Sequence, residues 1–195
     1  MTHPLRLVVL VSGSGSNLQA LIDAAAEPGA PFRVVAVGAD RDGTLGLERA
    51  VGNGIPPRAC RVPARPPRAA WDEALARLIS DAVPDLVVSA GFMKVLGPTV
   101  LARHRVINTH PALLPSFPGA HGVRDAMAHG VRVTGCTCHW VDAGGDTGAI
   151  IDQRAVLAED DDTVETLHER IKVLERDMLV EVVRSLAADR SWQGA

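Results

Sequence analysis

Apolar residues along the first half of the chain occur in short continuous runs, each followed by a helical pattern. The runs cover 5–11, 32–39 and 85–90, with a weaker one at 55–60. Between them, apolar positions recur at helical spacing over 18–25, 45–51 and 69–82, and a proline-rich loop covers 61–68. Runs of this length are typical of strands buried on both faces of a parallel sheet. The pattern therefore predicts an α/β fold with a doubly wound, mostly parallel sheet.

The second half departs from this alternation. A short strand is predicted at 105–108, an irregular stretch with three prolines at 109–119, and a helix at 122–129. Strands at 132–141 and 150–157 are separated only by the loop 142–148, which suits an antiparallel pair. The residues Asp162-Thr163-Val164-Glu165 resemble a capping box and open a long amphipathic helix. The apolar stripe of this helix consists of Val164, Leu167, Ile171, Leu174, Met178 and Val182.

Composition and charge narrow the class of protein. The 195 residues are 47% hydrophobic and 22% charged, as in a soluble globular domain, and the net charge is −3. Nucleic-acid and membrane-surface binding both favour a basic excess, so neither partner is expected. No apolar run approaches the roughly 20 residues of a membrane helix, and the polar start predicts no signal peptide. We expect one cytoplasmic domain in which Cys60, Cys136 and Cys138 are buried or half-buried free thiols.

The loop after the first strand is rich in glycine and serine. Residues 12–17 (SGSGSN) lead directly into the first helical pattern. Backbone amides at such a turn, together with the helix dipole, favour an anion. A dinucleotide fingerprint fits only in part, because Leu18 holds its third glycine position and Asp40 is a loose match to the ribose-binding acid. A triphosphate P-loop is excluded by the lack of a lysine at the helix start. A monophosphate suits the loop best, and a tight turn without ligand stays an alternative.

Two further segments carry residues suited to acyl-transfer chemistry. Asn108 and His110 are two apart at a strand end, so their side chains project from one face. An amide donor beside an imidazole offers hydrogen bonds and a titratable proton to an oxyanion. The loop 142–148 adds Asp146, a carboxylate able to favour a charged imidazole. Taken separately, the two segments are equally compatible with a polar strand end and a solvated turn or cation loop, although an EF-hand is excluded.

Together and in this order, the segments resemble the glycinamide ribonucleotide formyltransferases, the folate-dependent enzymes of purine biosynthesis. The resemblance covers nearly the whole chain through residues 8–24 (VVLVSGSGSNLQALIDA), 89–98 (SAGFMKVLGP), 107–122 (INTHPALLPSFPGAHG) and 139–151 (HWVDAGGDTGAII). The block Asn108-Thr109-His110-Pro111 is specific for folate-dependent formyl transfer, and the 12–17 loop indicates the ribonucleotide branch. The resemblance implies one Rossmann-like formyltransferase domain over 1–195. Residues 1–100 would form its phosphate-binding half and 101–195 its catalytic and folate-binding half.

The resemblance also implies roles for individual residues. The catalytic residues would be Asn108, His110 and Asp146, and the substrate phosphate would lie on Gly15, Ser16 and Asn17. Glu175, on the long C-terminal helix, matches the carboxylate that contacts the glycinamide end of the substrate. The 10-formyltetrahydrofolate pocket would take Arg68, Met93, Lys94, Val95, Leu96 and Asn108, with Asp142, Ala143, Gly144, Gly145 and Asp146. The chain departs from the family at Lys94, where arginine is common, and at Ser116, where lysine is common.

The implied reaction moves the formyl group of 10-formyltetrahydrofolate onto the amine of N1-(5-phospho-D-ribosyl)glycinamide, in the de novo route to IMP. The amine attacks the formyl carbon directly, so no covalent enzyme intermediate and no metal are expected. Asn108 and a protonated His110 would stabilise the oxyanion, and Asp146 would keep the imidazole charged and oriented.

Other classes of protein stay as alternatives. A methionyl-tRNA formyltransferase carries an additional tRNA-binding domain, and a formyltetrahydrofolate hydrolase usually has an N-terminal regulatory domain. Neither domain is expected here. A non-catalytic dinucleotide-binding module would explain the glycine loop and the sheet but would leave Asn108, His110 and Asp146 without a role. The expected partners are therefore the two small-molecule substrates, and a homodimer is left open.

Overall fold

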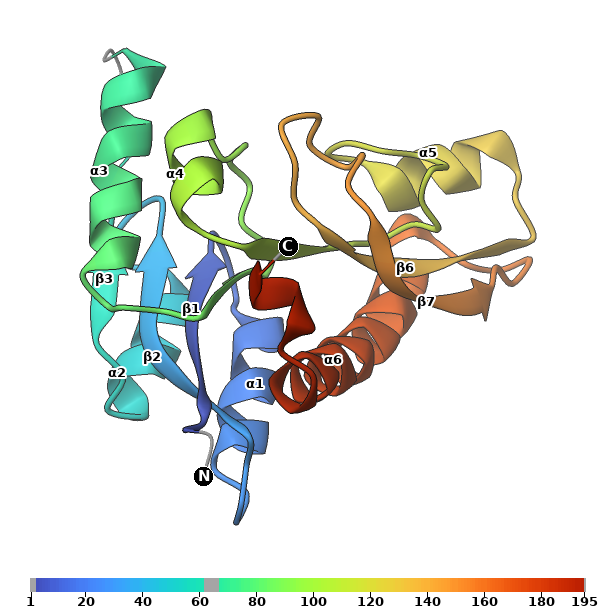
Figure 1. The fold of residues 1–195 in the computed structure, drawn as a ribbon. Coiled ribbons are helices and arrows are strands. Elements are labelled where there is room, and N and C mark those ends of the chain that lie inside the picture. Colours follow the sequence, from blue (N-terminus) through green and yellow to red (C-terminus); the bar gives the residue numbers. More distant parts are fainter. Residues whose placement is uncertain (1–2, 62–66, 195) are drawn as a thin grey trace.

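The computed structural model describes residues 3–61 and 67–194, so most of the predicted proline-rich loop lies outside the described residues. Seven strands form one sheet in the order β3-β2-β1-β4-β5-β6-β7 (Figure 1). Strands β1 to β5 pair in parallel, whereas β5–β6 and β6–β7 pair antiparallel. The predicted mixed sheet is therefore confirmed. The strands are β1 Leu5–Val11, β2 Phe32–Ala39, β3 Pro57–Ala59, β4 Leu86–Ser89, β5 Val106–His110, β6 Val133–Trp140 and β7 Ile150–Leu157.

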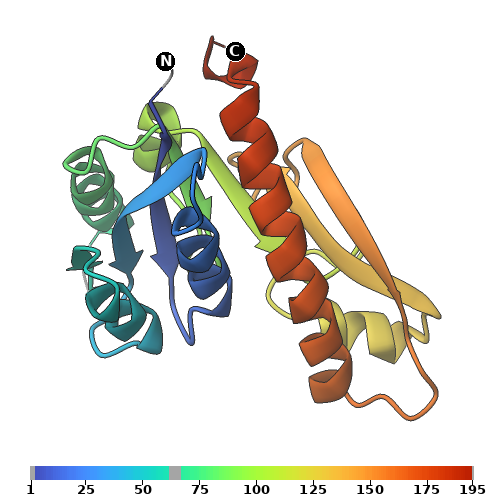
Figure 2. The ribbon, with the colours of Figure 1, turned by 90° about the horizontal axis from the view of Figure 1, so that it is seen from below.

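Helices cover both faces of the sheet, as a doubly wound fold requires. They are α1 Ser16–Ala25, α2 Leu45–Gly52, α3 Arg68–Ser80, α4 Pro98–Arg103, α5 Gly122–His129 and α6 Val164–Ala188, followed by a 3₁₀ turn at Ser191–Gly194. Buried residues of α1, α2 and α6 belong to one apolar cluster, and those of α3 and α4 belong to the other. The long α6 packs against α1 (Figure 2). None of the described helices is long and apolar enough to cross a membrane.

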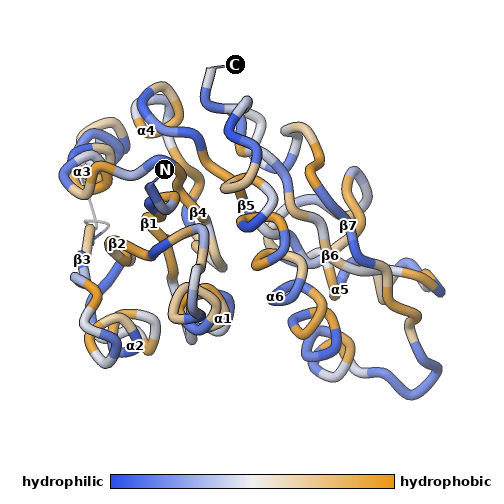
Figure 3. Tube along the Cα trace, turned by 60° about the horizontal axis from the view of Figure 1, so that its bottom comes forward, coloured by the Kyte–Doolittle hydropathy of each residue, from blue (hydrophilic) through white to orange (hydrophobic). Residues whose placement is uncertain are grey.

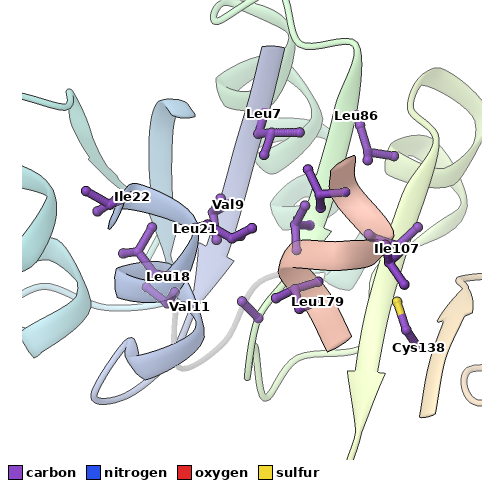
Figure 4. Close-up of a cluster of buried hydrophobic side chains, with 14 of the residues drawn as sticks. Leu7, Val9, Val11, Leu18, Leu21, Ile22, Leu86, Ile107, Cys138 and Leu179 are labelled. Atoms are coloured by element: carbon purple, nitrogen blue, oxygen red, sulfur yellow. The ribbon is translucent and has the colours of Figure 1, made fainter. Parts of the chain in front are cut away.

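The central strand β1 shows why its sequence is apolar from Leu7 to Val11. Leu7, Val9 and Val11 belong to the cluster that contains α1 and α6, and Figure 4 shows Val9 beside Leu21 and Val11 beside Leu18. Val8 and Leu10 point into the opposite cluster with α3. All five are fully buried. Figure 3 shows the same arrangement along the chain, with hydrophobic stretches in the central strands and hydrophilic turns on the surrounding helices.

Several predicted boundaries were wrong. The strand expected at 105–108 continues to His110, the strand expected at 55–60 is only Pro57–Ala59, and α4 was not predicted. The capping box joins Thr163 to Thr166 rather than Asp162 to Glu165. The Thr163 hydroxyl accepts from the Thr166 amide at 3.2 Å, and the Thr166 hydroxyl accepts from the Thr163 amide at 2.9 Å. The reason is that Thr163 is the last extended residue before the helix.

The strand order places the predicted site residues at one edge of the sheet. From β1 the chain moves outward to β2 and β3, then returns to β4 on the other side of β1. Ligands of open α/β sheets bind at such a reversal, outside the carboxyl ends of the strands. The loop after β1, the loop after β4 and the end of β5 at His110 all lie at this edge.

Candidate active site

The glycine loop between β1 and α1 turns its carbonyl groups toward α2. Gly13 accepts from the Gly46 amide at 3.1 Å, and Ser14 accepts from Arg49 Nε at 2.8 Å. Gly15 precedes α1 at φ +69°, and a Cβ there would lie 2.8 Å from the Gly46 Cα, so only glycine fits. The first amides of a helix have no acceptor within the helix. The loop therefore presents the amides of Gly15, Ser16 and Asn17 at a positive helix end, as an anion site requires.

The side chain of Asn17 points into the protein instead of toward a ligand. It is 6% exposed, and its Nδ2 donates to the Thr109 hydroxyl at 3.4 Å. Its Oδ1 has no hydrogen-bond partner among the described residues. The contact joins the start of α1 to β5, so the glycine loop and the end of β5 are held together.

Asn108 and His110 lie on β5 beside the antiparallel strand β6. Asn108 is directly opposite His139, and His110 is opposite Thr137. Asn108 Nδ2 lies 3.3 Å from Nε2 of His139, whose side chain is fully buried. Nδ1 of His139 lies 3.0 Å from its neighbour's carbonyl, at Trp140. With a proton on Nδ1, His139 donates to the Trp140 carbonyl, and its Nε2 accepts from the Asn108 amide.

Sequence reasoning did not identify His139 as part of the site. The antiparallel pair expected from the sequence joined 132–141 to 150–157, and no pairing of 132–141 with 105–108 was predicted. The β5–β6 register puts His139 opposite Asn108, and the sequence pattern does not fix this register.

Asp146 connects the two imidazoles. Its Oδ2 lies 3.6 Å from His110 Nδ1, and its Oδ1 lies 3.6 Å from His139 Nε2. The amide of Gly119 donates to Oδ2 at 2.7 Å and fixes the carboxylate. The structure thus brings together Asn108, His110 and Asp146, as predicted, and adds His139 between Asn108 and Asp146.

Both ring nitrogens of His110 face oxygen atoms. Nε2 lies 2.8 Å from the Phe117 carbonyl, and Nδ1 faces Asp146 at 3.6 Å. With a proton on Nε2 the ring donates to the Phe117 carbonyl. The distance of 3.6 Å from Nδ1 to Asp146 is too long for a hydrogen bond. Nδ1 is therefore the ring nitrogen that the Phe117 contact leaves available.

The backbone around His110 is shaped to hold this contact. Phe117 has φ +54°, a conformation that a bulky side chain rarely adopts. A Cβ on Gly122 would lie 2.9 Å from His110 Nε2 and 3.1 Å from the Phe117 carbonyl. The absence of a side chain at Gly122 thus allows α5 to approach the imidazole closely.

The predicted folate residues after β4 are mostly accessible. Met93 and Val95 are 67% and 71% exposed, and Arg68 contacts the Val95 carbonyl while stacking over Trp71. Lys94 Nζ lies 3.7 Å from the buried carboxylate of Asp40, so this acid has a partner within the protein.

Other predicted contacts have different surroundings. Leu96 is buried in the core against α3 and α4. In the loop after β6, the Asp142 carboxylate accepts from the Gly144 amide at 3.0 Å and from the Thr147 hydroxyl at 2.8 Å. Ser116 is exposed, and its amide donates to Leu113.

Glu175 lies on the buried side of α6 and is 7% exposed. Burial, together with the negative charge of Glu175, raises the pKa of the Cys136 thiol to about 12. Burial, Asp152 and Glu175 raise the pKa of Cys138 to about 12, and burial raises the pKa of Cys60. The prediction of three buried free thiols is confirmed.

A raised pKa disfavours the thiolate, which is the reactive form of cysteine, at neutral pH. We expect a folded Cys60→Ala/Cys136→Ala/Cys138→Ala protein to keep most of its activity in a steady-state assay. A covalent adduct trapped on any of the three sulfurs during turnover would contradict this expectation.

Within residues 3–61 and 67–194, no three His, Cys, Asp or Glu side chains gather closely enough to hold a metal ion. The site therefore offers amides, an imidazole pair and a carboxylate as its chemical groups.

Comparison with known proteins agrees with this geometry. The formyl transferase family matches residues 5–183. The chain is 55% identical over 186 residues to phosphoribosylglycinamide formyltransferase of Mycobacterium tuberculosis, covering 94% of this chain and 86% of that protein. It is 41% identical to the bovine trifunctional purine biosynthetic protein adenosine-3, covering 94% of this chain and 18% of that longer protein.

Solved structures give the same result. Glycinamide ribonucleotide transformylase 1 from Symbiobacterium toebii superposes with a TM-score of 0.93 at 43% identity, over 96% of this chain and 90% of that one. The corresponding protein from Geobacillus kaustophilus gives 0.90 at 38% identity, over 95% and 100% of the two chains. With the family match over residues 5–183, these identities and the matching fold, the chain belongs to the formyl transferase family.

Proposed function

We propose that this protein transfers the formyl group of 10-formyltetrahydrofolate to the amine of glycinamide ribonucleotide, giving the N-formyl product and tetrahydrofolate for purine synthesis. The observation that carries the proposal is the connected group Asn108, His139, Asp146 and His110 beside the glycine loop. Relatives named for this reaction match nearly the whole chain. Family membership itself supports a folate-derived formyl donor and small-molecule substrates.

The residues have distinct roles in the proposed reaction. Asn108 Nδ2 and His110 Nδ1 donate hydrogen bonds to the formyl oxygen as it gains negative charge. The substrate nitrogen forms the new bond to the formyl carbon, and the bond from that carbon to N10 of the folate breaks. The leaving N10 gains a proton and the attacking amine loses one. The charged His110 can give its Nδ1 proton toward N10 and then recover a proton from the amine, so the ring ends in the state in which it began. Asp146 offsets the charge on His110, and no protein atom becomes acylated.

Both substrates are assigned to the carboxyl ends of the strands. We assign the phosphate to the amides of Gly15, Ser16 and Asn17, and the glycinamide end to Glu175. The folate is assigned to Arg68, Met93, Lys94, Val95 and Leu96, with Asn108 and the loop from Asp142 to Asp146. The division into residues 1–100 and 101–195, a cytoplasmic location and a homodimer stay predictions. Three buried free thiols support the location.

The direct test is an assay of the purified protein with both substrates, following tetrahydrofolate and the formylated ribonucleotide. We expect the two products in equal amounts and only when both substrates are present. Formate released without the ribonucleotide would instead indicate a hydrolase. Formylation of methionyl-tRNA in its place would indicate the tRNA-directed branch.

The phosphate assignment makes a separate prediction. No described atom lies within 4 Å of a Cβ built on Gly13, so Gly13→Ala should fold normally. If the phosphate binds at this loop, the added methyl group enters the space beside it. The Kd for glycinamide ribonucleotide, measured by calorimetry, should then rise while the Kd for tetrahydrofolate stays close to wild type.

The matched control is Gly52→Ala, at the end of α2, where the space around a Cβ is also open. Ribonucleotide binding should be unchanged in this control. If Gly13→Ala weakened the binding of both ligands equally, the assignment of the phosphate to this loop would be wrong.

A further inference from the structure

Ser12 joins the two loops that meet where the strand order reverses. Its amide donates to the Gly91 carbonyl at 3.2 Å, and its hydroxyl accepts from the Met93 amide at 2.9 Å. The side chain is almost wholly buried, with 1% exposure. Ser12 is the residue immediately before Gly13, and Met93 begins the exposed segment after β4. The link is therefore short and runs directly from one loop to the other.

Each of the two loops also has contacts with a different part of the protein. The Ser12 carbonyl accepts a hydrogen bond from the Arg41 side chain at 2.5 Å, and the Gly13 carbonyl accepts one from the Gly46 amide. The glycine loop is therefore held by Arg41, which follows β2, and by Gly46 of α2. The loop after β4 is held at its far end by the buried carboxylate of Asp72.

Asp72 accepts from the Gly97 amide at 3.0 Å and from the Thr99 amide at 2.7 Å. Ser12 and Asp72 thus hold the two ends of the segment 93–97. Of these two contacts, the Ser12 contact is the one that also involves the glycine loop.

We propose that the Ser12 hydroxyl couples the binding of the two substrates, so that each binds more tightly when the other is present. This inference rests on the proposed function, which places the ribonucleotide on the glycine loop and the folate on Met93, Lys94 and Val95. A ligand that orders one loop also restricts the other through Ser12. The binding of the second ligand then costs less conformational entropy of the loops. Thermodynamic linkage makes the effect equal in both directions. Ser12 is a positioning residue, since its hydroxyl contacts the Met93 amide rather than a substrate.

The test measures a ratio of dissociation constants. The Kd of glycinamide ribonucleotide is determined alone and with saturating tetrahydrofolate, which has no formyl group to transfer. Wild-type protein should bind the ribonucleotide at least about fivefold more tightly in the presence of tetrahydrofolate, the lower end of typical coupling. In Ser12→Ala this ratio should fall to near one. Ser12→Cys keeps a side chain of similar size with a weaker acceptor, and its ratio should also fall, which covers the case of an unfolded alanine variant.

Amide exchange gives a readout that a general loss of stability would not reproduce. Adding the ribonucleotide alone should slow exchange of the Met93 amide in wild-type protein but not in Ser12→Ala. The matched control is Thr163→Ala, which also removes a hydroxyl acceptor from a backbone amide, that of Thr166 at 3.2 Å, at the start of α6. Its coupling ratio should equal that of wild type.

The outcomes separate this inference from the function it rests on. Tight binding of both ligands to wild-type protein with a ratio of one would overturn the coupling and leave the proposed function standing. A wild-type ratio retained in Ser12→Ala and Ser12→Cys would show that another contact couples the sites. If wild-type protein binds neither ligand, the proposed function is wrong and the coupling falls with it.

Discussion

Replacing Asp146 with asparagine is expected to lower kcat by about 10²-fold or more, the range of a positioned acid–base or oxyanion group. The substitution keeps the side-chain shape and removes the charge 3.6 Å from both His110 and His139. The imidazolium then loses its nearby counter-charge as the transition state forms. The affinity for glycinamide ribonucleotide should change little, because its phosphate is assigned to the glycine loop. Stopped-flow or steady-state rates, with calorimetric binding, measure both quantities.

The control for loss of one negative charge is Asp125→Asn on α5, whose carboxylate pairs with Arg124 at the surface. Its kcat should match wild type. If kcat fell by tenfold or less in Asp146→Asn, the main role of Asp146 would be to shape its loop. It would do so through the hydrogen bond that its carboxylate accepts from the Gly119 amide. Catalysis would then depend on Asn108 and His110 without a charge partner.

Replacing His110 with alanine is expected to have a larger effect, lowering kcat by about 10²- to 10⁴-fold. The variant loses the Nδ1 donor assigned to the reacting oxygen and the only proton-carrying group assigned between the two substrates. It also leaves the Phe117 carbonyl without its donor at 2.8 Å. Rates are measured at saturating concentrations of both substrates, so that a change in KM does not enter the comparison.

His104→Ala is the matched control for His110→Ala. His104 precedes β5, at the opposite end of the strand from His110, and its Nε2 lies 3.0 Å from the Ser80 hydroxyl. Removing it should change the thermal midpoint more than kcat. A His110→Ala protein with near-wild-type kcat would show that the imidazole is not needed for formyl transfer.

The first half of the fold was predictable because its signals are local. Leu5–Val11 is apolar at every position except Arg6, which in a domain of this size indicates a strand covered on both faces. The glycine and small polar residues of the 12–17 loop likewise predicted a tight turn between strand and helix. Asn108 and His110 were found because a spacing of two on a strand places both on one face, and the structure extends β5 far enough to include both.

The features that were missed depend on distant contacts. The short α4 starts at Pro98 and is fixed by Asp72 from α3, whose carboxylate reaches across to the Gly97 and Thr99 amides. Nothing in the local pattern of 93–103 contains that contact. His139 was missed for a related reason, because its role exists only in the register of β6 against β5. Propensity decides which segments become strands, but register decides which side chains meet.

The packing of α6 on α1 has a consequence for synthesis of the protein on the ribosome. Leu18 and Leu21 of α1 share a cluster with Leu179 and Val183, which are translated about 160 residues later. Domains fold largely as units as the nascent chain emerges. Until α6 has left the exit tunnel, the side of α1 that packs on α6 has no cover, although β1 and α2 already contact α1. We therefore expect α1, although encoded within the first twenty-five residues, to reach its final packing only when synthesis is nearly complete.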